Sequence, residues 1–89
     1  MWNKVEHDFG SIKAGTKLQY IFTHNGEKII RNTKPSCPCL SIYHKDKTLR
    51  VVWNTPDKIK ESYDSYKYVY LTYPNNEMEM LTLKATLVP

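Results

Sequence analysis

Cys37 and Cys39, separated by one proline, are the residues whose types and spacing come closest to a chemical site. Residues i and i+2 of an extended segment point to the same face, so both sulfurs could reach one metal ion. His44 is a weak candidate for a further ligand, with His7 and His24 as alternatives, whereas a closed zinc site needs four ligands. A disulfide between the two cysteines would close a small ring that the proline stiffens. The spacing favours thiols that pack as small hydrophobes, and a metal or redox role stays open.

No other part of the sequence has the pattern of a catalytic site. His7 and Asp8 are adjacent, but neighbouring residues on a strand point to opposite faces and cannot act together on one substrate. The order and spacing of a Ser, His and Asp triad, of a glycine-rich phosphate loop and of paired carboxylates are all missing. We therefore expect a protein that is not an enzyme and that carries no cofactor.

The elements that hold these residues are predicted to be strands. Seven tyrosines and only two alanines favour strands over helices. Apolar residues alternate with period two in three segments, which contain Leu18, Tyr20 and Phe22, then Leu49, Val51 and Trp53, and finally Leu81, Leu83, Ala85 and Leu87. A chain of 89 residues has room for one domain. The prediction is an all-β fold, a single immunoglobulin-like antiparallel β-sandwich of about seven strands over residues 1–89.

Two details of this sandwich follow from turn and edge signals. Asn25-Gly26 is a turn dipeptide, and Ile29-Ile30 is expected to open the next strand, which Pro35 stops. The segment Trp2–Val5 and the final strand, which runs to Val88, are expected to be sheet edges.

One motif resembles that of a known family. His7-Asp8-Phe9-Gly10-Ser11-Ile12, Gly15 and Ser36-Cys37-Pro38-Cys39 occur in that order. They resemble a bacterial family of uncharacterised immunoglobulin-like domains, marked by an HDFG-x-I-x-x-G start and an SCGC segment. That family is similar in fold to the ASH and major-sperm-protein domains, so the resemblance implies the same kind of sandwich. Pro38 stands where the family has glycine. The family has no single known activity, so the resemblance implies no function.

The residues expected to contact a partner are aromatic and arginine side chains, because these types are favoured at interfaces. They are Trp2 as an exposed anchor, with Tyr43, Tyr63, Tyr73, Arg31 and Arg50. Tyr66, Tyr68 and Tyr70 share one face of a strand and have two interpretations. Tyr68 is expected to be a tyrosine corner bonded to nearby backbone, and the alternative is an exposed tyrosine ladder that binds a partner.

The charge of the chain permits an acidic partner without naming one. The formal net charge is +4, and the basic residues of the middle strands are Lys28, Arg31, Lys34, Lys45, Lys47 and Arg50. A strip of these side chains beside Tyr43 could contact phosphates and stack a base. Acidic residues interrupt the strip, which favours a solvated face instead.

Three classes of function compete. The sequence favours a protein-binding module, an accessory subunit of a larger assembly, with a phage virion or capsid-decoration protein as the specific form. The alternatives are a nucleic-acid-associated basic protein and a metal- or redox-responsive domain centred on Cys37 and Cys39. No segment reaches the roughly 18–20 apolar residues of a membrane span, and no signal peptide is predicted. A cytoplasmic or virion-associated location is therefore expected.

Overall fold

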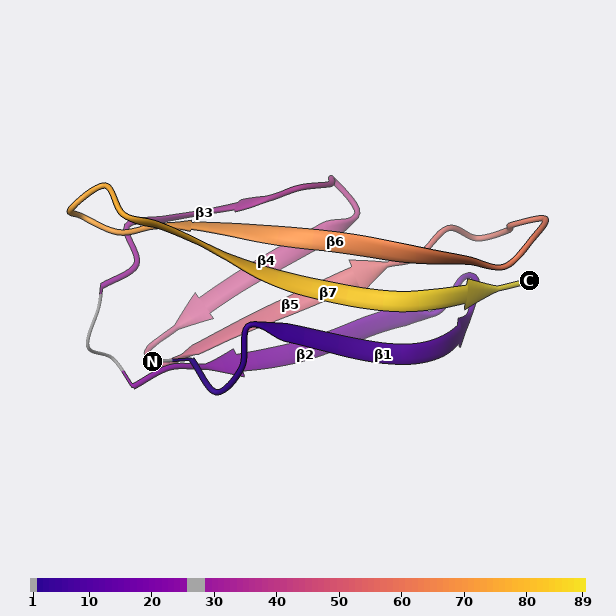
Figure 1. Cartoon of the computed structure of the whole chain (residues 1–89), viewed down its shortest axis with the longest axis horizontal. Coiled ribbons are helices and arrows are strands. Elements are labelled where there is room, and N and C mark those ends of the chain that lie inside the picture. The colour runs from indigo at the N-terminus through magenta and orange to yellow at the C-terminus, as the bar shows by residue number, and fades with distance from the viewer. Residues whose placement is uncertain (1, 26–28) are drawn as a thin grey trace.

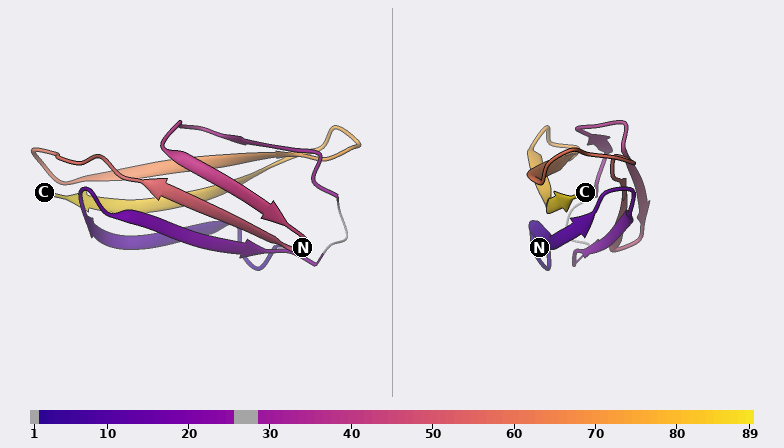
Figure 2. Two further views of the ribbon diagram at one scale, coloured as in Figure 1. Left: turned by 180° about the vertical axis from the view of Figure 1, so that it is seen from behind. Right: turned by 90° about the vertical axis from the view of Figure 1, so that its right-hand side faces the viewer.

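Seven strands in two packed sheets make up the described part of the chain, residues 2–25 and 29–89 of the computed structural model, and these residues form no helix. The strands are β1 (Glu6–Lys13), β2 (Lys17–Thr23), β3 (Asn32–Pro35), β4 (Leu40–Lys45), β5 (Thr48–Asn54), β6 (Tyr63–Thr72) and β7 (Met78–Val88). Figure 1 shows the strands of both sheets running roughly along the long axis, and Figure 2 shows the layers from behind and from one end. The predicted all-β sandwich is confirmed.

The order of the strands is that of an immunoglobulin sandwich. One sheet has the order β1-β7-β6-β3, and the other has the order β2-β5-β4. The run β7-β6-β3 corresponds to strands G, F and C of an immunoglobulin domain, and β2-β5-β4 corresponds to B, E and D. The first strand joins β7 instead of β2.

The core lies between the sheets and consists of the inward-facing residues that the alternation predicts. Leu49, Val51 and Trp53 of β5 are fully buried and face the buried positions of β7. The latter are Leu81, Leu83, Ala85 and Leu87. Because successive side chains of a strand point to opposite faces, the residues between them on β7 face outward.

Three expectations about strand pairing are wrong. β1 pairs with β7 in parallel, so the sandwich is not wholly antiparallel. β7 is an inner strand, flanked by β1 and β6, and not an edge. β3 begins at Asn32, not at Ile29, and it pairs with β6 in the sheet opposite β2. Alternation identifies a strand and its inward face, but it does not identify the neighbouring strand. Gly26 of the predicted turn lies outside the described residues.

The N-terminal segment crosses from one sheet to the other. Trp2 forms an isolated antiparallel bridge with His24, and the Asn3 N–H donates to the Thr23 carbonyl at 2.8 Å. Farther along, the Thr82 N–H donates to the Val5 carbonyl at 2.8 Å, where the chain joins β7. The segment therefore ties β2 of one sheet to β7 of the other.

The edge formed by β1 carries a β-bulge. The register with β7 shifts between Asp8 and Ser11, and Gly10 has a φ of 78°, which L residues with a side chain rarely adopt. The Asp8 carboxylate accepts a hydrogen bond of 2.8 Å from the Gly10 N–H. A bulge of this kind disrupts the regular row of backbone groups that another chain could pair with.

We expect Leu83→Ala to lower the free energy of unfolding by about 2–5 kcal/mol, because it opens a cavity between the sheets. Leu83 is fully buried in an inner strand. Thr82→Ala, one residue earlier on the outer face, is the control and should lower it by less than about 1 kcal/mol. Urea unfolding measures both values, and equal losses would contradict the assignment of the inward face.

Candidate functional site

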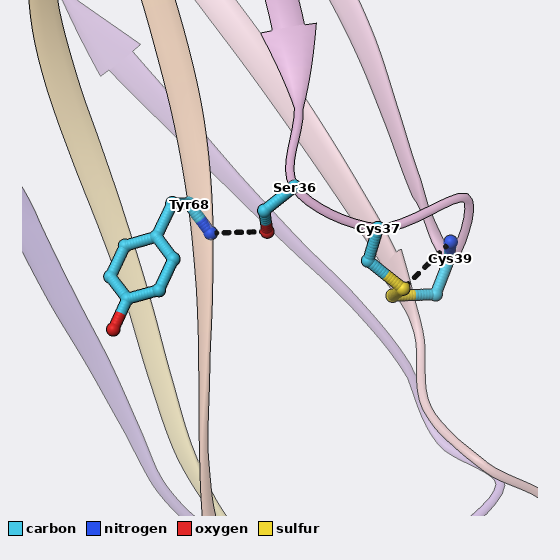
Figure 3. The surroundings of a disulfide bond; sticks show 4 residues. All are labelled: Ser36, Cys37, Cys39 and Tyr68. Carbon is cyan, nitrogen blue, oxygen red and sulfur yellow. Dashed lines mark hydrogen bonds between the residues drawn. A yellow bond between two sulfur atoms is a disulfide. The ribbon is translucent and has the colours of Figure 1, made fainter.

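The two cysteines form a disulfide, Cys37–Cys39, in the loop between β3 and β4. Figure 3 shows the bond and the Cys39 N–H donating to the Cys37 sulfur at 3.1 Å. The expectation of free thiols that pack as hydrophobes is therefore wrong. It assumed an extended segment, whereas the Leu40 N–H donates to the Cys37 carbonyl at 3.1 Å and closes a turn with Pro38 at its second position. The turn brings the two Cα atoms to 5.1 Å, within the range for a disulfide.

The disulfide leaves no thiolate pair for the predicted metal site. His44, the third candidate ligand, lies five residues beyond Cys39 along β4, which places it roughly 16 Å away. Its ring lies 5.7 Å from the ring of His24 instead. Across residues 2–25 and 29–89, no group of three or more His, Cys, Asp or Glu side chains could hold a metal ion.

A pocket of about 230 Å³ opens beside the disulfide, between the ends of the two sheets. The disulfide and Trp53 contribute to its wall, and so do alternate residues at the start of β6. The lining residues are Cys37, Cys39, Trp53, Asn54, Pro56, Tyr63, Ser65 and Lys67. Tyr63, a predicted contact residue, is thus exposed at the rim of a pocket that sequence reasoning did not anticipate.

Tyr43 and Arg50, two of the predicted contact residues, lie together on the outer face of the second sheet. They are register partners on β4 and β5, and the Arg50 guanidinium carbon lies 4.5 Å from the centre of the Tyr43 ring. Arg50 also donates to the Gln19 side-chain oxygen at 3.3 Å. Ile21, the register partner of Arg50 on β2, extends this surface and is 45% exposed.

Trp2 and Tyr73, two of the predicted partner contacts, make structural contacts inside the domain. Tyr73 is only 3% exposed, and Trp2 packs partly buried against the core. The Trp2 indole N–H donates to the Glu79 carboxylate at 2.9 Å, and the Tyr73 hydroxyl donates to the same oxygen at 2.5 Å. Burial and this hydrogen bond raise the pKa of Tyr73 to about 12. Trp2 and Glu79 are 77 residues apart in the sequence. A contact between residues so far apart leaves no local signal in the sequence.

The basic residues are divided between the sheets. Lys34 lies on β3 of the first sheet, whereas Lys45 and Arg50 lie on β4 and β5 of the second. Arg31, the remaining predicted contact, precedes β3, and its backbone N–H donates to the Thr72 carbonyl at 2.8 Å. Lys28 lies outside the described residues. The predicted strip therefore does not lie on one face of the domain.

Sequence reasoning missed part of an exposed surface on β6 and β7. We call it the tyrosine–methionine face, and its members are Tyr66, Tyr68, Tyr70, Met78 and Met80. Tyr70 and Met80 are register partners near its centre. The sequence did contain a signal for this face. Met78 and Met80 stand at even-numbered positions of β7, whereas its buried leucines stand at odd-numbered ones, so the methionines point to the opposite face. All five residues occupy outward positions of the first sheet.

Tyr68 belongs to this outer face and is not a tyrosine corner. Its ring lies 6.5 Å from the ring of Tyr70, between centres. Its contacts with the disulfide loop are made by its backbone. The Tyr68 N–H donates to the Ser36 hydroxyl at 2.9 Å (Figure 3). The Ser36 N–H in turn donates to the Tyr68 carbonyl at 2.9 Å.

No protein family, no curated protein and no solved structure matches this chain. The described residues also contain no helix long and apolar enough to cross a membrane.

We expect reduction of the disulfide to lower the free energy of unfolding by only about 1.6 kcal/mol. The bond closes a loop of three residues, and the chain-entropy relation gives about 3 kcal/mol for a loop of fifteen. Urea unfolding with and without reductant measures the difference. The control is the double variant Cys37→Ser/Cys39→Ser, whose stability should not respond to reductant. Two reactive thiols in the folded, unreduced protein would contradict the disulfide.

Proposed function

We propose that this domain is a non-enzymatic protein-binding module, an accessory subunit of a larger assembly, that binds its partner through the tyrosine–methionine face. The observation that carries the proposal is the exposure of three large apolar side chains on one sheet face. Met78 is 70% exposed, Met80 is 46% exposed and Tyr66 is 45% exposed.

The composition of this face is that of an interface. The outer face of an antiparallel sheet in contact with water normally carries polar side chains, whereas β6 and β7 place tyrosine and methionine there. Tyrosine and methionine are enriched at protein interfaces. Methionine adapts its shape to a partner because its unbranched chain is flexible and polarizable.

Polar residues border the face on the side of β1. The Lys84 ammonium lies 5.6 Å from the centre of the Tyr66 ring and 3.9 Å from the Asp8 carboxylate. Thr82 is the register partner of Tyr68. An apolar centre with a polar rim is the usual anatomy of a protein–protein interface.

The nucleic-acid alternative has less support. Binding to phosphates needs several cations that act on one surface. Here Lys34 lies in one sheet, and Lys45 and Arg50 lie in the other. Membership of a larger assembly rests on the analogy with other small immunoglobulin-like domains. Capsid decoration stays its specific form, as predicted from the sequence.

We expect Met80→Glu to weaken partner binding by at least about tenfold, because it places a charge at the centre of the face. Ile21→Glu is the matched control, because Ile21 is 45% exposed on the opposite sheet. Tagged protein is recovered from the native source, fractionated by particle size and analysed by mass spectrometry. The dissociation constant of each variant for the recovered partner is then measured.

Loss of binding by Ile21→Glu and not by Met80→Glu would assign the interface to the Tyr43 and Arg50 surface, and would contradict the proposal. Recovery of nucleic acid that is lost as salt rises would support the alternative function instead.

A further inference from the structure

The first half of β6 lacks a neighbour on one side. β3 pairs with β6 only over Val69–Thr72, and the chain then turns away through Ser36 toward β4 (Figure 1). β6 itself begins at Tyr63, so residues 63–67 pair with β7 and with no other described strand. Both backbone groups of Tyr68 point toward the β3 side. Because these directions alternate along an antiparallel strand, the N–H and C=O of Asp64 and Tyr66 point to the same open side.

The pocket beside the disulfide lies directly at this open edge. Tyr63, Ser65 and Lys67, the inward-facing residues of the same segment, form one of its walls. A strand added beside Asp64 and Tyr66 would place alternate side chains on the inward side of the sheet, as β3 does farther along. One of those side chains would therefore enter the pocket.

The pocket wall carries polar groups beside the ring of Trp53, which is 0% exposed. Lys67 adds a positive charge to the wall and forms no ion pair with the described residues. Ser65 adds a hydroxyl.

These groups determine which kind of side chain the pocket would bind. An ammonium group beside a hydroxyl favours an acceptor with negative charge, and a carboxylate has both properties. The volume of about 230 Å³ is below the roughly 300 Å³ at which small-molecule sites begin. The pocket therefore fits one side chain better than a cofactor.

We propose that an extended peptide segment of a partner protein binds as an additional strand beside Asp64 and Tyr66, and that it inserts a glutamate or aspartate side chain into the pocket. The backbone of β6 provides the affinity for an extended chain, and the pocket provides the choice of side chain. The contact with Lys67 selects an acidic residue. This site uses the edge of β6 and is separate from the tyrosine–methionine face, so it goes beyond the proposed function.

The test uses two blocked synthetic peptides that alternate threonine and valine around one central residue. That residue is glutamate in the first peptide and glutamine in the second. Threonine and valine favour the extended conformation. Each peptide is titrated into the full chain labelled with ¹⁵N, and NMR spectra record backbone amides together with the Trp53 indole N–H. We expect the glutamate peptide to bind at least about tenfold more tightly than the glutamine peptide, since a charged acceptor forms a stronger hydrogen bond than a neutral one.

The expected shifts fall on the Asp64 and Tyr66 amides and on the Trp53 indole N–H. Lys67→Met, which keeps the aliphatic chain, should reduce the affinity for the glutamate peptide to that for the glutamine peptide. Lys34→Met on β3 is the control and should leave both affinities unchanged. Equal affinities for the two peptides, shifts confined to another edge, or no binding by either peptide would overturn the proposal. The Met80→Glu variant should bind the peptides as the unaltered chain does. Failure of the proposed function at the tyrosine–methionine face can therefore be told apart from failure of this edge site.

Discussion

The structure depends on a single apolar layer between two sheets, with Trp53 as its largest fully buried side chain. Trp53 on β5 is the register partner of Leu18 on β2 and of Leu40 on β4. The centre of the Phe9 ring, from β1, lies 6.3 Å from the centre of the Trp53 ring. A domain of 89 residues has only one such layer, so each strand must keep one face apolar. Burial of Trp53 also removes its N–H from water, and its side chain lies where the layer opens into the pocket.

The layer is closed at its other end by the N-terminal segment. Trp2 packs edge-on against Phe22, with the ring centres 6.5 Å apart, and shares Glu79 with Tyr73. Side chains from the beginning of the chain and from near its end thus meet in one hydrogen-bonded group. The surfaces left for binding are the outer faces of the sheets and the edges that no bulge or turn protects.

The sequence predicted what depends on local alternation and missed what depends on distant neighbours. The buried leucines of β7 follow from period two, and so does the inward set of β5 around Trp53. The parallel pairing of β1 with β7 has no such signature, because alternation is the same for either neighbour. The disulfide was missed because Pro38 was placed in an extended segment and not in a turn. Met80 was missed because only the inward register of β7 was followed.

β6 contributes to both proposed surfaces, since its outer side chains form the tyrosine–methionine face and its free edge borders the pocket. The central claim is that this edge is open beside Asp64 and Tyr66. Amide hydrogen exchange in the free protein, resolved by residue, tests it most directly. We predict fast exchange at Asp64 and Tyr66, and slow exchange at Ser65 and Lys67, whose amides face β7. Protection of Asp64 and Tyr66 equal to that of Ser65 and Lys67 would show that the edge is already paired, and would contradict the account.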